Sequence, residues 1–149
     1  MLPEGKAVRL RLGPQEREFL GELLAGLAAL LEEDAADDPA LRRLRPDGYA
    51  DAEAAAEFRQ LTEDDLRRSQ LDALDQVRSS LRGSGADAEL VLDAVTVEAW
   101  LMTLTQMRLV LAVRLGLTED SGPRDDPEFA GYDWLTALQD LLVRLAMDG

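Results

Sequence analysis

Residues 95–117, with the sequence VTVEAWLMTLTQMRLVLAVRLGL, form the longest apolar stretch of the chain. The stretch contains Glu98, Arg108 and Arg114, and a membrane-spanning helix rarely carries three charges. Apolar residues lie on most sides of a helix drawn through it, which is typical of the central helix of a bundle. We therefore predict a buried core helix around which the rest of the fold packs.

Both ends of this core helix carry capping residues. Asp93 or Thr96 is expected to cap the N-terminus, because either side chain can accept a hydrogen bond from a free backbone N–H. Gly116 is a natural C-terminal stop, so the helix is expected to reach Leu115. One face is predicted to be its main packing surface: Val97, Trp100, Leu101, Leu104, Met107, Leu111 and Leu115.

A second long helix is predicted upstream, from Pro14 to about Glu33, because Pro suits a first helical turn and leucines follow at helical spacing. Gly21, Ala25 and Ala29 form a row of small residues on it. We expect this row to allow close helix packing inside the domain; a seam between two copies in a homodimer is the alternative.

Residues 39–45 and 52–60 are predicted to form two short helices. Thr62 then resembles the N-cap of a separate helix, because acidic residues follow it in the first turn. That helix is expected to end at Gly83-Ser84-Gly85. The last helix is expected to open at Tyr132 or Asp133.

Two short segments have strand character. Residues 8–12 alternate apolar and polar side chains, and residues 89–92 are short and apolar. We predict that they pair, and that the ribbon packs on the helices, because two strands alone are marginal in water. The predicted fold is mainly α: one domain over residues 1–149, a compact bundle of about four to six helices with a small two-stranded β ribbon.

Composition restricts the function classes. The 149 residues carry 16 Lys and Arg against 30 Asp and Glu, a formal net charge of −14. The sequence has no Cys and no His, which removes thiol nucleophiles, Ser-His catalysis and Cys or His metal sites. No secretory signal follows Met1, so we expect a cytoplasmic protein. From the composition and charge we also expect no catalytic residues, no cofactor and no membrane contact.

Carboxylates are the remaining side chains that could act in catalysis or bind a metal ion. Glu98 and Asp140 are the acids of the two most apolar helices, and we expect them on helix surfaces rather than buried with a raised pKa. The acidic residues between Asp120 and Glu128 do not match an EF-hand, and the run from Glu32 to Asp38 is expected to be a solvated loop. We therefore predict no metal site.

Arginines cluster between residues 42 and 68, which is the least acidic part of the chain. Intramolecular ion pairs are the simpler interpretation of this cluster, and contact with phosphate or an acidic partner is the alternative. Whether nucleic acid is bound stays open, because the charge opposes it over most of the surface. The candidate partner contacts are Arg42, Arg43, Arg45, Arg67 and Arg68.

Several segments resemble the AosR-like family, long catalogued as an actinobacterial domain of unknown function. The similar segments include LTQMRLVL at 104–111, YDWL at 132–135 and AAAEFRQLTEDDLR at 54–67, together with the strand Arg9-Leu10-Arg11-Leu12. The family-motif residues, which we also expect in the core, are Trp100, Leu104, Arg108, Arg114, Gly116, Tyr132, Trp134 and Leu135. We expect Arg108 or Arg114 to pair with an acid or to cap carbonyls.

The resemblance implies a non-enzymatic regulator of transcription or stress response that binds other proteins, with transcription machinery as the expected partner. It also suggests two alternatives: direct DNA binding, or an accessory role in Clp-type proteolysis. Relatives are thought to sense redox state through cysteines, which this chain lacks. It also has Thr105-Gln106 where an Asn-Asp pair is expected, so no role of that pair is carried over.

Overall fold

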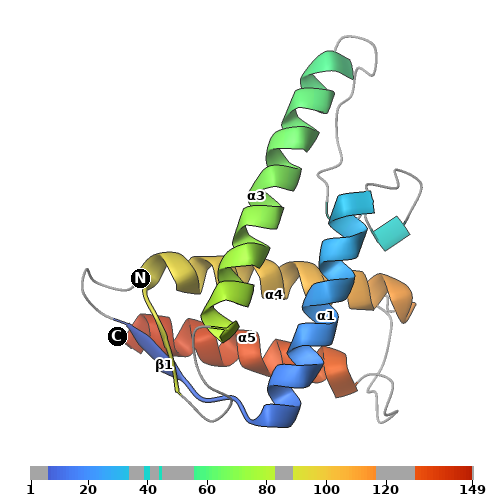
Figure 1. Ribbon diagram of the computed structural model, residues 1–149. Coiled ribbons are helices and arrows are strands. Elements are labelled where there is room, and N and C mark those ends of the chain that lie inside the picture. The colour runs from blue at the N-terminus through green and yellow to red at the C-terminus, as the bar shows by residue number, and fades with distance from the viewer. Residues whose placement is uncertain are drawn as a thin grey trace.

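A computed structural model describes residues 7–33, 39–40, 44, 56–82, 89–116 and 130–148 (Figure 1). Its regular elements, in chain order, are β1 (Val8–Leu10), α1 (Pro14–Glu33), α3 (Ala56–Arg82), β2 (Leu90–Leu92), α4 (Ala94–Arg114) and α5 (Ala130–Asp148). These segments confirm a mainly helical fold, with four long helices and one two-stranded sheet.

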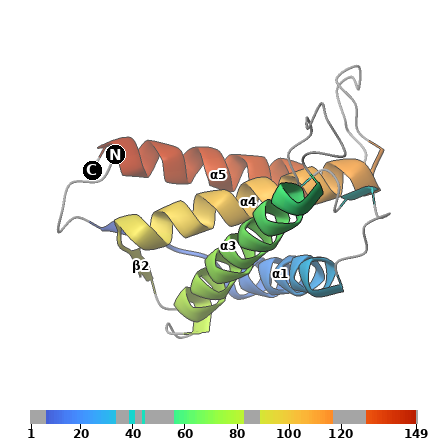
Figure 2. The same cartoon turned by 90° about the horizontal axis from the view of Figure 1, so that it is seen from above.

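Helix α4 is the centre of the bundle. Figure 2 shows α5 running along one side of it, while α1 and α3 lie on the other. The long helix α3 crosses α4 at a steep angle, so one end of α3 projects away from the bundle (Figure 1). No helix within the described segments combines the length and the apolar character that a bilayer crossing needs.

Strands β1 and β2 pair antiparallel, with Val8 opposite Leu92 and Leu10 opposite Leu90. These four side chains are buried, whereas Arg9 and Val91 between them are exposed. The pairing predicted for residues 8–12 with 89–92 is confirmed, although each strand is only three residues long. The two-stranded ribbon is stable because its inner face packs into the helical core.

Helix α1 confirms the predicted range from Pro14 to Glu33. The expectation for its small residues is wrong: Gly21, Ala25 and Ala29 are all exposed, so they are not used for close packing inside the domain. The leucine face opposite makes the intramolecular contacts instead, since Leu20, Leu24, Leu27, Leu30 and Leu31 are buried.

Helix α3 corrects two predictions. We expected one helix to end near Gln60 and another to begin at Thr62, yet α3 runs without a break from Ala56 to Arg82. Residues 56–64 contain no Gly or Pro, and one Thr inside a helix costs only about 0.5 kcal/mol relative to Ala. The expected stop at Gly83 lies outside the described residues.

The ends of α4 confirm the predicted caps. Asp93 is the N-cap, and its carboxylate accepts a hydrogen bond of 2.8 Å from the backbone N–H of Thr96. Leu115 is the C-cap, and Gly116 has a φ of +70°, the left-handed conformation that favours glycine. Helix α5 extends back to Ala130, whereas we predicted its start at Tyr132 or Asp133.

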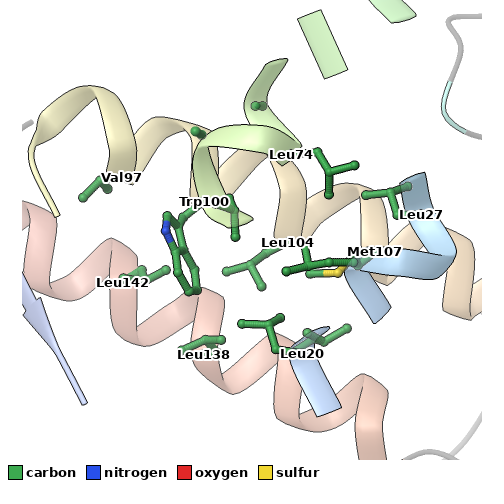
Figure 3. Packing of buried hydrophobic residues seen from close by; sticks show 14 of the residues in the cluster. Leu20, Leu27, Leu74, Val97, Trp100, Leu104, Met107, Leu138 and Leu142 are labelled. Carbon is green, nitrogen blue, oxygen red and sulfur yellow. The ribbon is translucent and has the colours of Figure 1, made fainter. Parts of the chain in front are cut away.

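Trp100 lies at the middle of the hydrophobic core. Its side chain is fully buried between α4 and α5, beside Leu138 and Leu142 (Figure 3). Leu20 from α1 and Leu74 from α3 pack around the same core. The helices are thereby joined through one continuous apolar cluster, which fixes how α3 lies against α4.

Candidate functional site

An open, shallow groove of about 570 Å³ lies along the crossing of α3 and α4. Both helices supply its walls: Asp65, Arg68, Ser69, Asp72, Ala73 and Gln76 come from α3, and Val95, Glu98, Ala99 and Met102 come from α4.

Helical periodicity explains why α4 presents these four residues together. Val95, Glu98, Ala99 and Met102 are spaced as i, i+3, i+4 and i+7, which places them on one face of the helix. The small residues Ala73 and Ala99 are buried, so they form a floor that a second chain can approach closely. Val95 and Met102 stand about 10.5 Å apart along the helix axis.

Two apolar residues at this groove are open to solvent. Val95 is 64% exposed and Met102 is 36% exposed. Single exposed apolar residues need no explanation, but here two of them border a groove with an apolar floor. The groove therefore offers a small apolar surface that a partner can cover.

Carboxylates dominate the polar rim of the groove. Asp65 and Asp72 come from α3 and Glu98 from α4, against the single cation Arg68. Arg68 Nη1 lies 3.5 Å from Asp65 Oδ1 and pairs with it on the exposed surface. The groove therefore has a net negative charge, on a chain that is itself strongly acidic.

A part-buried hydrogen bond joins the two helices that line the groove. The indole Nε1 of Trp100 donates to Ser80 Oγ at 2.9 Å, joining α4 to α3. Ser80 Oγ in turn donates to the carbonyl of Val77 at 2.7 Å. The groove is thus built on a fixed crossing rather than on loops.

A polar network joins α4 to α5 on the other side of α4. Gln139 Nε2 donates to Thr105 Oγ1, and Arg108 Nη1 donates to Gln139 Oε1, both at 2.6 Å. The guanidinium of Arg108 also lies 5.5 Å from the centre of the Tyr132 ring, close enough for a cation–π contact. Gln139 therefore satisfies both a hydroxyl and a cation at once.

We expected either Arg108 or Arg114 to pair with an acid or to cap carbonyls, and at Arg108 this is not what the network shows. Within the described segments its partners are an amide oxygen and an aromatic ring, not an acid or a backbone carbonyl. Arg114 is exposed in the last turn of α4 rather than in the core. Gly116 is also exposed, because its role is to end the helix.

The other family-motif residues are divided between core and edge. Trp100, Leu104 and Leu135 are buried as predicted, whereas Tyr132 and Trp134 are only half-buried. Trp134 stacks edge-on against Phe19, with ring centres 5.6 Å apart, and its Nε1 donates to Glu16 at 3.1 Å. These contacts attach the start of α5 to α1.

The arginine cluster is only partly described. Arg67 Nε donates to the carbonyl of Leu31 at 2.7 Å, and its Nη2 donates to the carbonyl of Glu32 at 3.3 Å. Arg67 therefore caps the C-terminal end of α1, where a cation also complements the helix dipole. Arg42, Arg43 and Arg45 lie outside the described residues, so their partner contact stays a prediction.

The acidic residues considered for chemistry lie at the surface. Glu98 and Asp140 are exposed, which confirms a helix-surface position for both. The described segments contain no group of three or more Asp or Glu side chains placed to hold a metal ion. The acidic residues between Asp120 and Glu128 lie outside those segments.

Among the described residues, three buried polar atoms of α4 have no hydrogen-bond partner: Thr103 Oγ1, Gln106 Oε1 and Arg108 Nε. Gln70 of α3, by contrast, is buried and donates from Nε2 to the carbonyl of Leu44 at 3.1 Å. None of Thr103, Gln106 and Gln70 lines the α3–α4 groove. None of these three polar residues belongs to a sequence motif that predicts a site.

Fold and groove together define a small acidic helical domain with a two-stranded ribbon and an open surface between two crossing helices. The family comparison assigns residues 1–146 to the domain of unknown function DUF2017. The chain therefore belongs to the DUF2017 family. Comparisons with curated proteins and with solved structures gave no significant match.

Proposed function

We propose that the chain is a non-enzymatic cytoplasmic regulatory protein that acts by binding other proteins in transcription or the stress response. The observation that carries this proposal is the α3–α4 groove, where exposed Val95 and Met102 border an apolar floor. The resemblance to AosR-like regulators supplies the biological process. Transcription machinery is accordingly the partner that we propose.

The described arginines support protein binding over direct DNA binding. Arg67 is engaged with the end of α1, and Arg68 is paired with Asp65. Binding to the DNA backbone needs cations that can replace the counterions of phosphate. A net charge of −14 opposes that contact over most of the surface.

The proposal is tested by affinity capture of the tagged full chain from an extract of its source organism, with and without nuclease, followed by mass spectrometry. RNA polymerase or sigma subunits that survive nuclease treatment would support it. Loss of those subunits with nuclease would favour direct DNA binding. Recovery of Clp components instead would favour the accessory role in proteolysis, and recovery of no specific protein would refute protein binding.

A further inference from the structure

We infer that the α3–α4 groove accepts a cationic amphipathic helix of a protein partner, with its apolar stripe on Ala73, Ala99, Val95 and Met102. This inference rests on the proposed function and names the chemistry of the partner segment. The occupant is specified by two features that occur together: an apolar floor and a negative rim.

The length of the α3 wall suits a helix. An amphipathic helix presents apolar anchors at i, i+3, i+4 and i+7, so it can lay one continuous apolar stripe along the groove. The α3 wall extends from Asp65 to Gln76, about 16 Å along the helix axis, or roughly three turns. A segment of about 15 residues is therefore long enough to fill the groove.

The floor allows close approach. Ala73 and Ala99 are 5% and 6% exposed, and neither has a side chain beyond Cβ to hold a partner away. A Leu or Met side chain on the incoming helix can sit between Val95 and Met102 and cover both. Covering exposed apolar area of this kind is the main favourable term in helix-in-groove binding.

The rim selects the sign of the partner's charge. Asp72 and Glu98 face the groove from opposite helices, so Lys or Arg residues on both edges of an amphipathic helix can reach a carboxylate. Arg68 lies beside Asp65, so Asp72 and Glu98 leave the balance of the rim negative. An acidic segment would meet like charge on both sides, so opposite charge sets both the encounter rate and the specificity.

The experiment uses the full chain and three fluorescent peptides of about 15 residues in anisotropy titrations. The first peptide has a Leu stripe flanked by Lys and Arg. The second has the same residues in scrambled order, and the third keeps the stripe but replaces the cations with Glu. We expect the first peptide to bind at least about tenfold more tightly than either of the others.

Matched variants localise the binding. Met102→Lys and Glu98→Lys change the groove, while Met147→Lys and Asp140→Lys make the same changes at exposed positions of α5. We expect the groove variants to weaken the first peptide about tenfold and the α5 variants to change it less than about twofold. Circular dichroism confirms that each variant keeps its helices.

Four results would overturn the inference. They are equal binding of the scrambled peptide, equal binding of the acidic peptide, equal losses in the groove and α5 variants, and a dimer of the chain that Met102→Lys converts to a monomer in sedimentation. The last result would make a second copy the occupant. If the peptide titrations fail, proteins recovered by affinity capture must bind elsewhere on the chain. If the capture fails, binding of the cationic peptide is still measurable. The two failures are therefore distinguishable.

Discussion

Trp100 of α4 donates its indole N–H to Ser80 of α3 at 2.9 Å, so the walls of the groove are joined by a hydrogen bond from the core. The indole ring is fully buried, and the Ser80 hydroxyl accepts its N–H. A buried donor that loses its acceptor costs more free energy than the net value of the bond itself. This contact therefore bears on both folding and the shape of the groove.

Ser80→Ala is expected to lower the free energy of unfolding by about 1 to 3 kcal/mol, because it leaves the Trp100 N–H without its acceptor. Ser79→Ala is the matched control, because Ser79 directly precedes Ser80 in α3 and is exposed. This control should change the free energy of unfolding by less than about 0.5 kcal/mol. Urea denaturation measures both. Equal effects of the two substitutions would show that the Trp100–Ser80 bond is energetically unimportant.

Arg67 and Arg68 are adjacent but should behave differently. Arg67→Ala removes the hydrogen bonds to the last carbonyls of α1 and is expected to cost about 1 to 2 kcal/mol. Arg68→Ala removes only an exposed pair with Asp65 and should cost about 0 to 0.5 kcal/mol. Thermal denaturation compares them, and a larger loss from Arg68→Ala would contradict the capping role of Arg67.

Replacing glycine by alanine is expected to change stability in opposite directions at Gly131 and Gly21. A Cβ at Gly131 would lie 2.7 Å from Phe19 Cζ, so Gly131→Ala is expected to destabilise the fold by about 1 to 3 kcal/mol. A Cβ at Gly21 meets nothing within 4 Å, so Gly21→Ala should stabilise α1 by up to about 1 kcal/mol. Melting temperatures test the pair. Destabilisation by Gly21→Ala would mean that its face is covered in solution, as a homodimer seam requires.

Asp93 makes the stability of α4 depend on pH in the acidic range. Hydrogen bonds from the Thr96 side chain and from its backbone N–H hold the pKa of the Asp93 carboxyl below its ordinary value. The unfolded chain therefore takes up the proton first. The stabilisation is complete above the unfolded pKa of about 3.9 and is lost as the pH falls through the lower folded pKa.

Asp93→Asn keeps a capping oxygen but removes the titration. The difference in melting temperature between wild type and this variant should be constant from pH 7 to about pH 5 and should shift against the wild type below about pH 4. Other carboxylates titrate in both proteins, so the difference isolates Asp93. A difference that does not vary with pH would show that the Thr96 hydrogen bonds do not depend on the charge.

Local signals made most of the fold predictable. The leucine spacing after Pro14 and the caps at Asp93 and Gly116 follow from short-range rules. The two strand segments are also visible locally, whereas their pairing joins parts of the chain that are far apart in sequence. The false helix start at Thr62 shows the limit of these rules. A capping residue favours a helix start without requiring one, and an uninterrupted run of helix formers prevailed.

The groove could not be predicted from the sequence because it depends on how two helices cross. Helix α4 is apolar on most sides, so periodicity alone does not show that Val95 and Met102 face solvent while Trp100 is buried. The role of Gln139 was equally hidden, because the sequence does not show which residues of α4 lie opposite α5. The family-motif residues gave the core positions of Trp100 and Leu135 but not the position of the groove.

The central claim is that the protein binds its partner through the α3–α4 groove. Its most direct test is parallel affinity capture from source-organism extract with Met102→Lys and Met147→Lys as baits, quantified against wild type by mass spectrometry. The account predicts that Met147→Lys retains the nuclease-resistant partner and that Met102→Lys loses most of it, up to about 90% for a tenfold weaker interface. Full retention by Met102→Lys, with its helical content unchanged, would contradict the account.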